Sequence, residues 1–183
     1  PSAFLVLFGG VRRLTLYNNR LQRVPEQIGR LGHLVHLDLG RNAIEASPTV
    51  FAALRAHPAL RGISLDSAVA GLPEAALADL ATITRLEHAD LARNALQLTA
   101  EGWQHLGSLV HLRSLDLGYN QITLTEQATP HLNLLIELRD LRLNNNPLLH
   151  APSLRELGAL EVLNLADCQI NEWPHGLSAL MNH

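Results

Sequence analysis

The sequence predicts an α/β solenoid: a right-handed superhelix with a parallel β-sheet on its concave side and short helices on its convex side. One pattern, Leu-x-x-Leu-x-Leu-x-x-Asn-x-Leu, recurs in full or near-full form along almost all of the 183 residues. Its copies start at Val11, Leu34, Leu60, Leu86, Leu112, Leu138 and Leu160, at intervals of 23, 26, 26, 26, 26 and 22 residues. Such regular spacing indicates stacked units that share one continuous core.

Each unit contains a short segment with the periodicity of a β-strand. Leucines at positions four and six alternate with polar residues, as at Leu37/Leu39 and Leu115/Leu117. A period of two residues is typical of a strand with one buried face. Because parallel strands cannot be joined by tight hairpins, the rest of each unit must form a crossover. We expect the strand centres at Leu14, Leu37, Ile63, Ala89, Leu115, Leu141 and Leu163.

The crossovers of the second to fifth units are predicted to be helical. Ser47-Pro48 combines an N-cap residue with proline at the first helical position, and Thr99 and Thr125 stand in the same column. Pro130 lies inside the fifth crossover and should shorten or bend its helix. The shorter first unit has Val24-Pro25 instead, which favours a tighter 3-10 or extended crossover.

A column of asparagines, together with the single cysteine, has a structural interpretation. A side-chain amide at this position can bond the backbone of the turn that leaves the strand, and buried backbone groups need such partners. The third unit has Ala68 in this column and Ala70 at the next apolar position, so we expect the weakest packing there. Cys168 occupies the column in the last unit, and one cysteine excludes an internal disulfide framework. The asparagines of the column are Asn19, Asn42, Asn94, Asn120 and Asn146.

Composition excludes several classes of function. A net charge of -3 gives no electrostatic basis for binding nucleic acid, and no apolar run approaches the roughly 20 residues of a membrane span. All 14 basic residues are arginine. Either a GC-rich genome or selection against ubiquitin acceptor sites in a host cell explains the absence of lysine. The absence of Asn-x-Ser/Thr acceptors and of disulfide-bonded caps favours a bacterial or cytosolic origin.

No catalytic, cofactor or metal motif is present in the sequence. There is no phosphate loop, nucleophile elbow or dinucleotide fingerprint. His36 and His88 share a surface column two units apart, which places them roughly 10 Å from one another, too far for one ion. The sequence therefore predicts a non-enzyme without a cofactor.

The outward positions of the strands and of the turns after them are the predicted partner-binding surface. Asp90 should lie about 4.8 Å from Asp116, and like charges that close are unfavourable unless something compensates them. Arg93 and Arg41 could compensate them internally, a basic partner could do so, or a cation could bind between them. The predicted partner-binding residues are Arg13, Tyr17, His36, Asp38, Arg41, His88, Asp90, Arg93, Asp116, Tyr119, Asp140, Arg142 and Asn164.

The repeated motif resembles the leucine-rich repeat family almost from end to end. This resemblance implies a leucine-rich repeat solenoid over residues 1–183, with about seven repeats, that binds a partner protein on its concave face. The form of Leu138–Leu148 and of Ile170–Pro174 is similar to the repeat regions of bacterial secreted effectors of the novel ubiquitin-ligase type. That narrower resemblance implies a target-recognition region of a larger protein, delivered into a host cytosol. An enzyme fragment whose catalytic domain lies elsewhere and an adhesive surface array are the alternatives. Because neither end shows a polar cap, we expect the chain to be a fragment.

Overall fold

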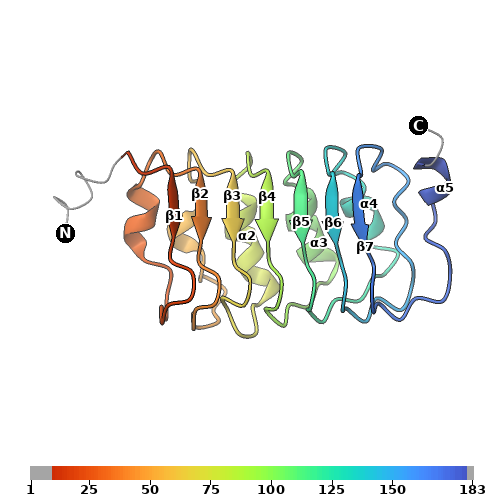
Figure 1. Ribbon diagram of the computed structural model, residues 1–183, viewed down its shortest axis with the longest axis horizontal. Coiled ribbons are helices and arrows are strands. Elements are labelled where there is room, and N and C mark those ends of the chain that lie inside the picture. Colours follow the sequence, from red (N-terminus) through yellow and green to blue (C-terminus); the bar gives the residue numbers. More distant parts are fainter. Residues whose placement is uncertain (1–9, 181–183) are drawn as a thin grey trace.

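The computed structural model describes residues 10–180, which form one layered solenoid (Figure 1). Seven parallel strands lie side by side in chain order. The seven predicted strand centres are the middle residues of these strands, so the strand prediction is confirmed. Residues 1–9 and 181–183, which include both chain ends, lie outside the described residues. The strands are β1 (Arg13–Thr15), β2 (His36–Asp38), β3 (Gly62–Ser64), β4 (His88–Asp90), β5 (Ser114–Asp116), β6 (Asp140–Arg142) and β7 (Val162–Asn164).

Short helices form a second layer behind the sheet (Figure 1). The first crossover is a 3-10 helix, as Val24-Pro25 predicts. In the fifth, Pro130 stands in the first turn of a helix of only four residues, which confirms the expected shortening. The helices are η1 (Glu26–Arg30), η2 (Ala52–Leu54), η3 (Glu74–Ala76), α2 (Leu77–Ala81), α3 (Ala100–Gly107), α4 (Thr129–Leu132) and α5 (Leu177–Leu180).

Two of the predicted helix starts are wrong. In the second unit only three residues of 3-10 helix form, beginning at Ala52, and the Ser47 hydroxyl accepts the Thr49 N–H at 3.2 Å within a turn. In the fifth unit the helix begins at Thr129 rather than after Thr125. Thr99 does directly precede α3, but its side chain does not cap that helix. A capping residue type specifies a turn as readily as a helix start, because its side chain bonds nearby N–H groups in both.

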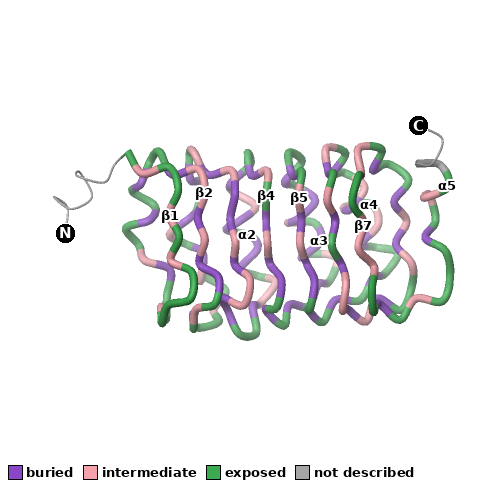
Figure 2. The backbone as a smooth tube through the Cα atoms, viewed as in Figure 1, coloured by how far each residue is buried: buried purple, intermediate pink, exposed green. Residues whose placement is uncertain are grey.

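The core lies between the two layers, and both the strands and the crossovers contribute buried residues to it (Figure 2). Phe51 and Trp103, from the crossovers, and Leu115, from the sheet, are at most 1% exposed. Burying each such side chain contributes about 1.5–3 kcal/mol. Few aromatic residues are needed because stacked leucines fill this narrow interior.

The asparagine column is confirmed as a structural ladder. Asn94 is 1% exposed, and its Nδ2 group donates to the carbonyl groups of Leu65 at 2.9 Å and Leu91 at 3.0 Å. Its Oδ1 atom accepts the N–H groups of Ala68 at 3.1 Å and Val69 at 2.9 Å. Asn42, Asn120 and Asn146 bond in the same way, so four of the five asparagines tie their own turn to that of the preceding repeat, whereas Asn19 bonds only within its own turn.

The third unit does not show the expected packing defect. Ala70 is exposed and takes no place in the apolar column. Val69 takes it instead: this residue is fully buried and bridges to Ile44 of the second unit. The turn is one residue shorter here, so neither alanine leaves a gap.

Candidate functional site: the sheet face

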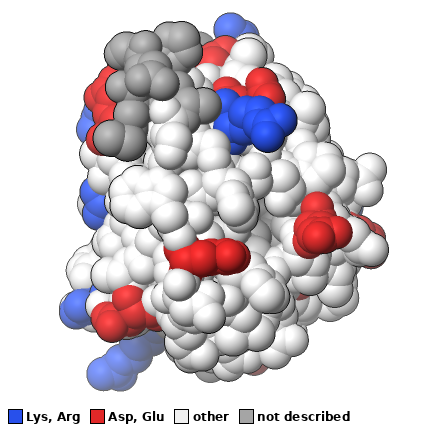
Figure 3. Space-filling view, turned by 90° about the vertical axis from the view of Figure 1, so that its right-hand side faces the viewer, with Lys and Arg blue, Asp and Glu red and all other residues white. Residues whose placement is uncertain are grey.

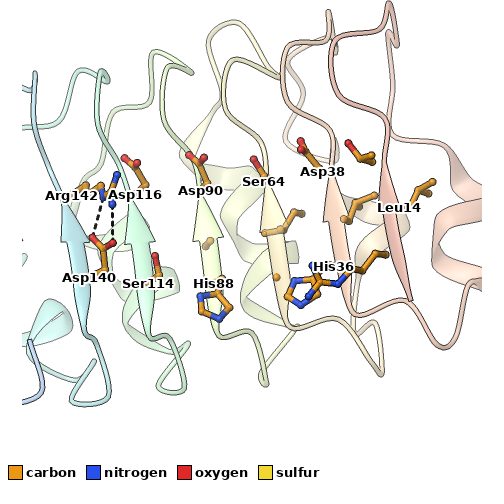
Figure 4. Close-up of a pocket in the computed structure, with 16 residues that line it drawn as sticks. Leu14, His36, Asp38, Ser64, His88, Asp90, Ser114, Asp116, Asp140 and Arg142 are labelled. Carbon is orange, nitrogen blue, oxygen red and sulfur yellow. Dashed lines mark hydrogen bonds and ion pairs between the residues drawn. The ribbon is translucent and has the colours of Figure 1, made fainter. Parts of the chain in front are cut away.

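The outward side of the sheet is open and contains a hollow of about 560 Å³. We call this hollow the sheet-face groove; residues of β1 to β6 line it, mainly the first and last of each strand (Figure 4). Its floor is low because three of these positions carry small residues, namely Gly62, Ser64 and Ser114. The predicted partner-binding residues are mainly charged and do not include these three small residues, although the small residues occupy the same positions of the repeat.

Three carboxylates form a row at the carboxyl ends of the strands (Figure 4). This acidic row consists of Asp38, Asp90 and Asp116, with Ser64 between the first two. The parallel register pairs Asp90 directly with Asp116. One oxygen of each carboxylate accepts the backbone N–H two residues further on, at 2.9, 3.0 and 2.8 Å respectively. These bonds fix one oxygen of each carboxylate, and the other oxygen forms no hydrogen bond or ion pair with the described residues.

Burial dominates the electrostatics of Asp90 and Asp116. Burial is the largest cause that raises the pKa of Asp90, and the charges of Asp116 and Asp66 raise it further. The hydrogen bond from the Ala92 N–H and the charge of Arg93 lower it. Burial likewise raises the pKa of Asp116, against the N–H of Gly118 and the Arg142 charge. The folded chain therefore holds these two ionised carboxylates at a free-energy disadvantage that an added cation would relieve.

The arginines nearest the row are engaged elsewhere. Arg93 forms an ion pair with Asp66 at 3.1 Å and lies 4.3 Å from the centre of the Tyr119 ring. Arg41 lies over Tyr17, at 5.6 Å. Neither arginine forms an ion pair with Asp90 or Asp116, and the predicted internal compensation is limited to the charge of Arg93, which lowers the pKa of Asp90. Among the described residues, no arginine or histidine forms an ion pair with any member of the acidic row.

Arg142 forms an ion pair with Asp140 of the same strand, β6. Two of its nitrogen atoms donate to both oxygens of Asp140, at 3.1 and 3.0 Å. A bidentate pair of this kind is among the stronger charged contacts in proteins. Arg142 therefore acts on Asp116, its register partner, only as a neighbouring charge.

His36 and His88 lie closer together than the sequence predicts. Their ring centroids are 6.5 Å apart, with 34° between the ring planes. The estimate of roughly 10 Å assumed side chains standing straight out from the sheet. Gly62 lies between them in register, and a Cβ atom there would overlap the His36 ring. The missing side chain lets His36 lean across β3 toward His88. Burial, followed by the charges of Arg13 and His88, lowers the pKa of His36, while Glu87 opposes this.

The predicted partner-binding residues fall into two groups. Those in the groove are Arg13, His36, Asp38, His88, Asp90, Asp116, Asp140 and Arg142. Tyr17, Arg41, Arg93 and Tyr119 instead stand on the turns after the strands, beside the groove. Asn164 ends β7, where its side chain accepts the Ala166 N–H at 3.1 Å.

Two turn positions beside the groove carry large side chains on strained backbone. Arg93 and Tyr119 have φ angles of 57° and 55°, in the left-handed region. The equivalent positions at Asn18 and Asn145 carry asparagine, which adopts this region more readily. Tyr119 is nevertheless 48% exposed, so its ring is available to a partner.

A thiol site and a metal cluster find no support within residues 10–180, and the end of the solenoid seen in Figure 3 carries only scattered charged side chains of both signs. Cys168 is buried, burial raises the pKa of its thiol, and its Sγ atom donates to the Leu143 carbonyl at 3.1 Å. It therefore takes the structural place of the column asparagine. No cluster of three or more metal-ligand side chains occurs in this range, nor does a helix with the length and apolarity of a membrane span.

Comparison with known proteins decides between solenoid classes. A family profile described as "Leucine Rich repeat" matches residues 108–125. The fold is that of a leucine-rich repeat protein. The ectodomain of the Arabidopsis thaliana receptor kinase GASSHO1/SCHENGEN3 is similar over 91% of this chain, with 28% identity and a TM-score of 0.68. The Drosophila Toll–Spatzle complex contains a chain similar over 91%, with 24% identity and a TM-score of 0.63. An internalin of Listeria monocytogenes, inlF, is similar over 92%, with 21% identity and a TM-score of 0.59.

The chain spans only a part of each of these structures. It spans 20% of the plant ectodomain, 22% of the Toll–Spatzle chain and 52% of the internalin. No curated protein is significantly similar to it in sequence. The family profile is a repeat and indicates no enzyme, and such repeats are typical of protein-binding modules.

Proposed function

We propose that this leucine-rich repeat protein binds a partner protein on its sheet face, and that the partner presents cationic side chains to the acidic row. The observation that carries the proposal is that Asp38, Asp90 and Asp116 are fixed by backbone N–H groups and unpaired with any cation of the described chain. Burial already raises the pKa of two of them, so a basic group would gain by neutralising them.

The charge of the whole groove supports the same partner chemistry. Four aspartates and two arginines line it, which leaves a net charge of −2 with neutral histidines. Complementary charge steers association and favours one class of partner over others. Tyr119 beside the groove offers an exposed aromatic ring of the type enriched at binding hot spots.

Two similar structures bind protein ligands according to their descriptions. The plant ectodomain is in complex with CASPARIAN STRIP INTEGRITY FACTOR 2, and the Drosophila protein is in complex with Spatzle. We extend only the general mode to this chain, namely recognition of a polypeptide by the repeats.

A photo-crosslinking experiment tests the proposal. A photoreactive residue replaces Ser114 in the groove or, as a matched control, exposed Ala78 on α2 of the helical layer. Each protein is irradiated in extracts of the cells that produce it. We expect a discrete adduct from position 114 only, and its loss in the double variant Asp90→Asn and Asp116→Asn and at high salt, which screens such contacts. Equal adducts from both positions, or an adduct indifferent to the double variant, would contradict the proposal.

We also propose that the repeats serve as the target-recognition region of a larger bacterial effector. The mixture of 22-, 23- and 26-residue units and the complete absence of lysine favour it. Sequencing the full reading frame tests this proposal: a lysine-free reading frame with a downstream cysteine-nucleophile domain would support it. An anchoring segment would instead support the adhesive array.

A further inference from the structure

The groove contains a second chemical feature at the opposite ends of the strands from the acidic row. His36 begins β2 and His88 begins β4, and both face Gly62 of the strand between them. Figure 4 shows the His36 ring directed across that strand toward His88. The two imidazoles come from β2 and β4, which both hydrogen-bond to β3, so the backbone fixes the spacing of their Cα atoms.

The geometry points to a site for one transition-metal ion held between His36 and His88, of the class that prefers nitrogen ligands: Cu²⁺, Ni²⁺ or Zn²⁺. With metal–nitrogen distances of about 2.0–2.1 Å, two imidazoles on one ion have centroids roughly 5–6 Å apart. The observed 6.5 Å is close to that range. A turn about χ2, which is a soft torsion in histidine, closes the remaining gap.

Gly62 is the residue that makes this pair possible. Any larger residue would place its Cβ atom against Nδ1 of His36 and drive the ring away from His88. The glycine is not required by its backbone, because it lies in a regular strand and is not among the residues with a positive φ. Its role is therefore spatial.

The chain supplies two ligands to such an ion and leaves its other positions open. Within residues 10–180 no third histidine, cysteine or carboxylate completes a cluster. Arg13 repels a cation at His36, while Glu87, next to His88 in sequence, attracts it. Glu87 lies 4.0 Å from Arg61 and 3.7 Å from Arg113, which limits its contribution. Water or a partner's side chain must fill the open positions.

Titration with Cu²⁺ alone tests the site, because Cu²⁺ binds such ligands more tightly than Ni²⁺ or Zn²⁺. Affinity is measured by calorimetry, and the number of bound nitrogens by electron paramagnetic resonance. We expect one tight equivalent with two imidazole nitrogens. His36→Asn and His88→Asn should each weaken it at least roughly tenfold, because the second imidazole binds intramolecularly at high effective concentration.

Two further variants keep the result interpretable. His111→Asn removes an exposed histidine on the flank and leaves the same number of histidines as either site variant; it should bind Cu²⁺ like the wild type. Gly62→Ala keeps both ligands but displaces the His36 ring, so it should weaken binding while the melting midpoint stays close to that of the wild type. Tight binding that survives in both single histidine variants, or in Gly62→Ala, would overturn the proposal. No partner protein enters the experiment, so its outcome is independent of the proposed function.

Discussion

Glu74 caps the helix of the following repeat by bonding to Thr99. Its Oε2 atom accepts the Thr99 N–H at 2.7 Å, and its Oε1 atom accepts the Thr99 hydroxyl at 2.7 Å. Oε2 also accepts the Gly102 N–H at 3.2 Å, so the third repeat satisfies the N–H of Thr99, the residue before α3, and one free N–H group of the first turn of α3. The helix N-terminus also favours a negative charge. A side chain of one unit thus stabilises the next, which couples the repeats beyond their shared core.

Replacing Glu74 by alanine should therefore destabilise the chain. Loss of a helix cap costs about 0.5–2 kcal/mol, and two backbone donors lose their partner here. We expect a fall in this range in the free energy of unfolding by urea. Glu101→Ala is the control, since Glu101 lies in the first turn of the same helix and bonds none of its N–H groups; it should change stability by less than about 0.5 kcal/mol. Equal effects of the two substitutions would show that the cap is unimportant.

Asn94→Ala should be far more damaging than the same change at the edge of the ladder. The Asn94 side chain satisfies backbone groups of two repeats, all of them buried. Each buried group left unpaired costs about 1–3 kcal/mol, so we expect a loss of at least about 3 kcal/mol. Asn19 occupies the same column but is exposed, and water can replace its bonds to Leu16 and Tyr17. Asn19→Ala should cost under about 1 kcal/mol. Chemical denaturation of both variants checks the difference.

Stability should fall on mild acidification because of His57. This histidine is 5% exposed, and its Nδ1 atom accepts the N–H groups of Ala59 and Leu60 at 3.3 and 3.2 Å. Burial lowers the pKa of His57, although the carbonyl groups of Leu31 and Ile28 oppose this. In the unfolded chain a histidine takes up its proton near pH 6.5. Below that pH His57 is protonated in the unfolded chain but still neutral in the folded chain. The free energy of unfolding therefore falls as the pH decreases, until the pH reaches the pKa of His57 in the folded chain.

His57→Asn isolates this effect. The Oδ1 atom of asparagine stands where Nδ1 of histidine does and can accept the same two N–H groups, but asparagine does not titrate. Thermal melting of both proteins between pH 7.5 and 5 should show a steeper decline for the wild type, bounded by about 1.4 kcal/mol per pH unit for one proton. Parallel declines would mean that His57 is protonated equally in the folded and unfolded chains.

The sequence predicts the backbone of this protein better than the contacts of its long side chains. The repeat period places Leu37, Leu115 and Asn94 correctly, because each column must meet its equivalent in the next unit. Crossover geometry is less certain, because three residues of 3-10 helix bury Phe51 and Leu54 as well as a longer helix would.

In the candidate site, too, the backbone positions follow from the sequence, whereas the contacts of the side chains do not. Strand register alone places Asp90 beside Asp116. The contacts of Arg93 with Asp66 and Tyr119 instead depend on several side-chain torsions, which the sequence period does not determine. The approach of His36 to His88 depends on the absence of a side chain at Gly62. A sequence pattern of charged and polar side chains does not indicate the space that a glycine without a side chain provides.

The acidic row should show opposite effects of one substitution on stability and on binding. The pKa values of Asp90 and Asp116 are raised in the folded chain, mainly by burial. At neutral pH ionisation therefore favours the unfolded state, and this loss begins as the pH rises above the unfolded value of about 3.9. Asparagine keeps an oxygen for the N–H groups of Ala92 and Gly118 but carries no charge. Asp90→Asn with Asp116→Asn should thus leave the free energy of unfolding unchanged or raise it by up to about 0.5 kcal/mol.

Binding of a basic partner should respond in the other direction. The same double variant removes the charges that a cationic group would contact, and adding Tyr119→Ala removes an exposed ring whose truncation at a hot spot can cost about 2 kcal/mol or more. The triple variant should therefore melt close to the wild type yet capture the crosslinked partner poorly. Leu115→Ala provides the contrast, because it deletes a fully buried side chain from the same strand and should lose about 2–5 kcal/mol of stability. A triple variant that is well folded and binds the partner as the wild type does would exclude the sheet face and direct attention to the helical layer.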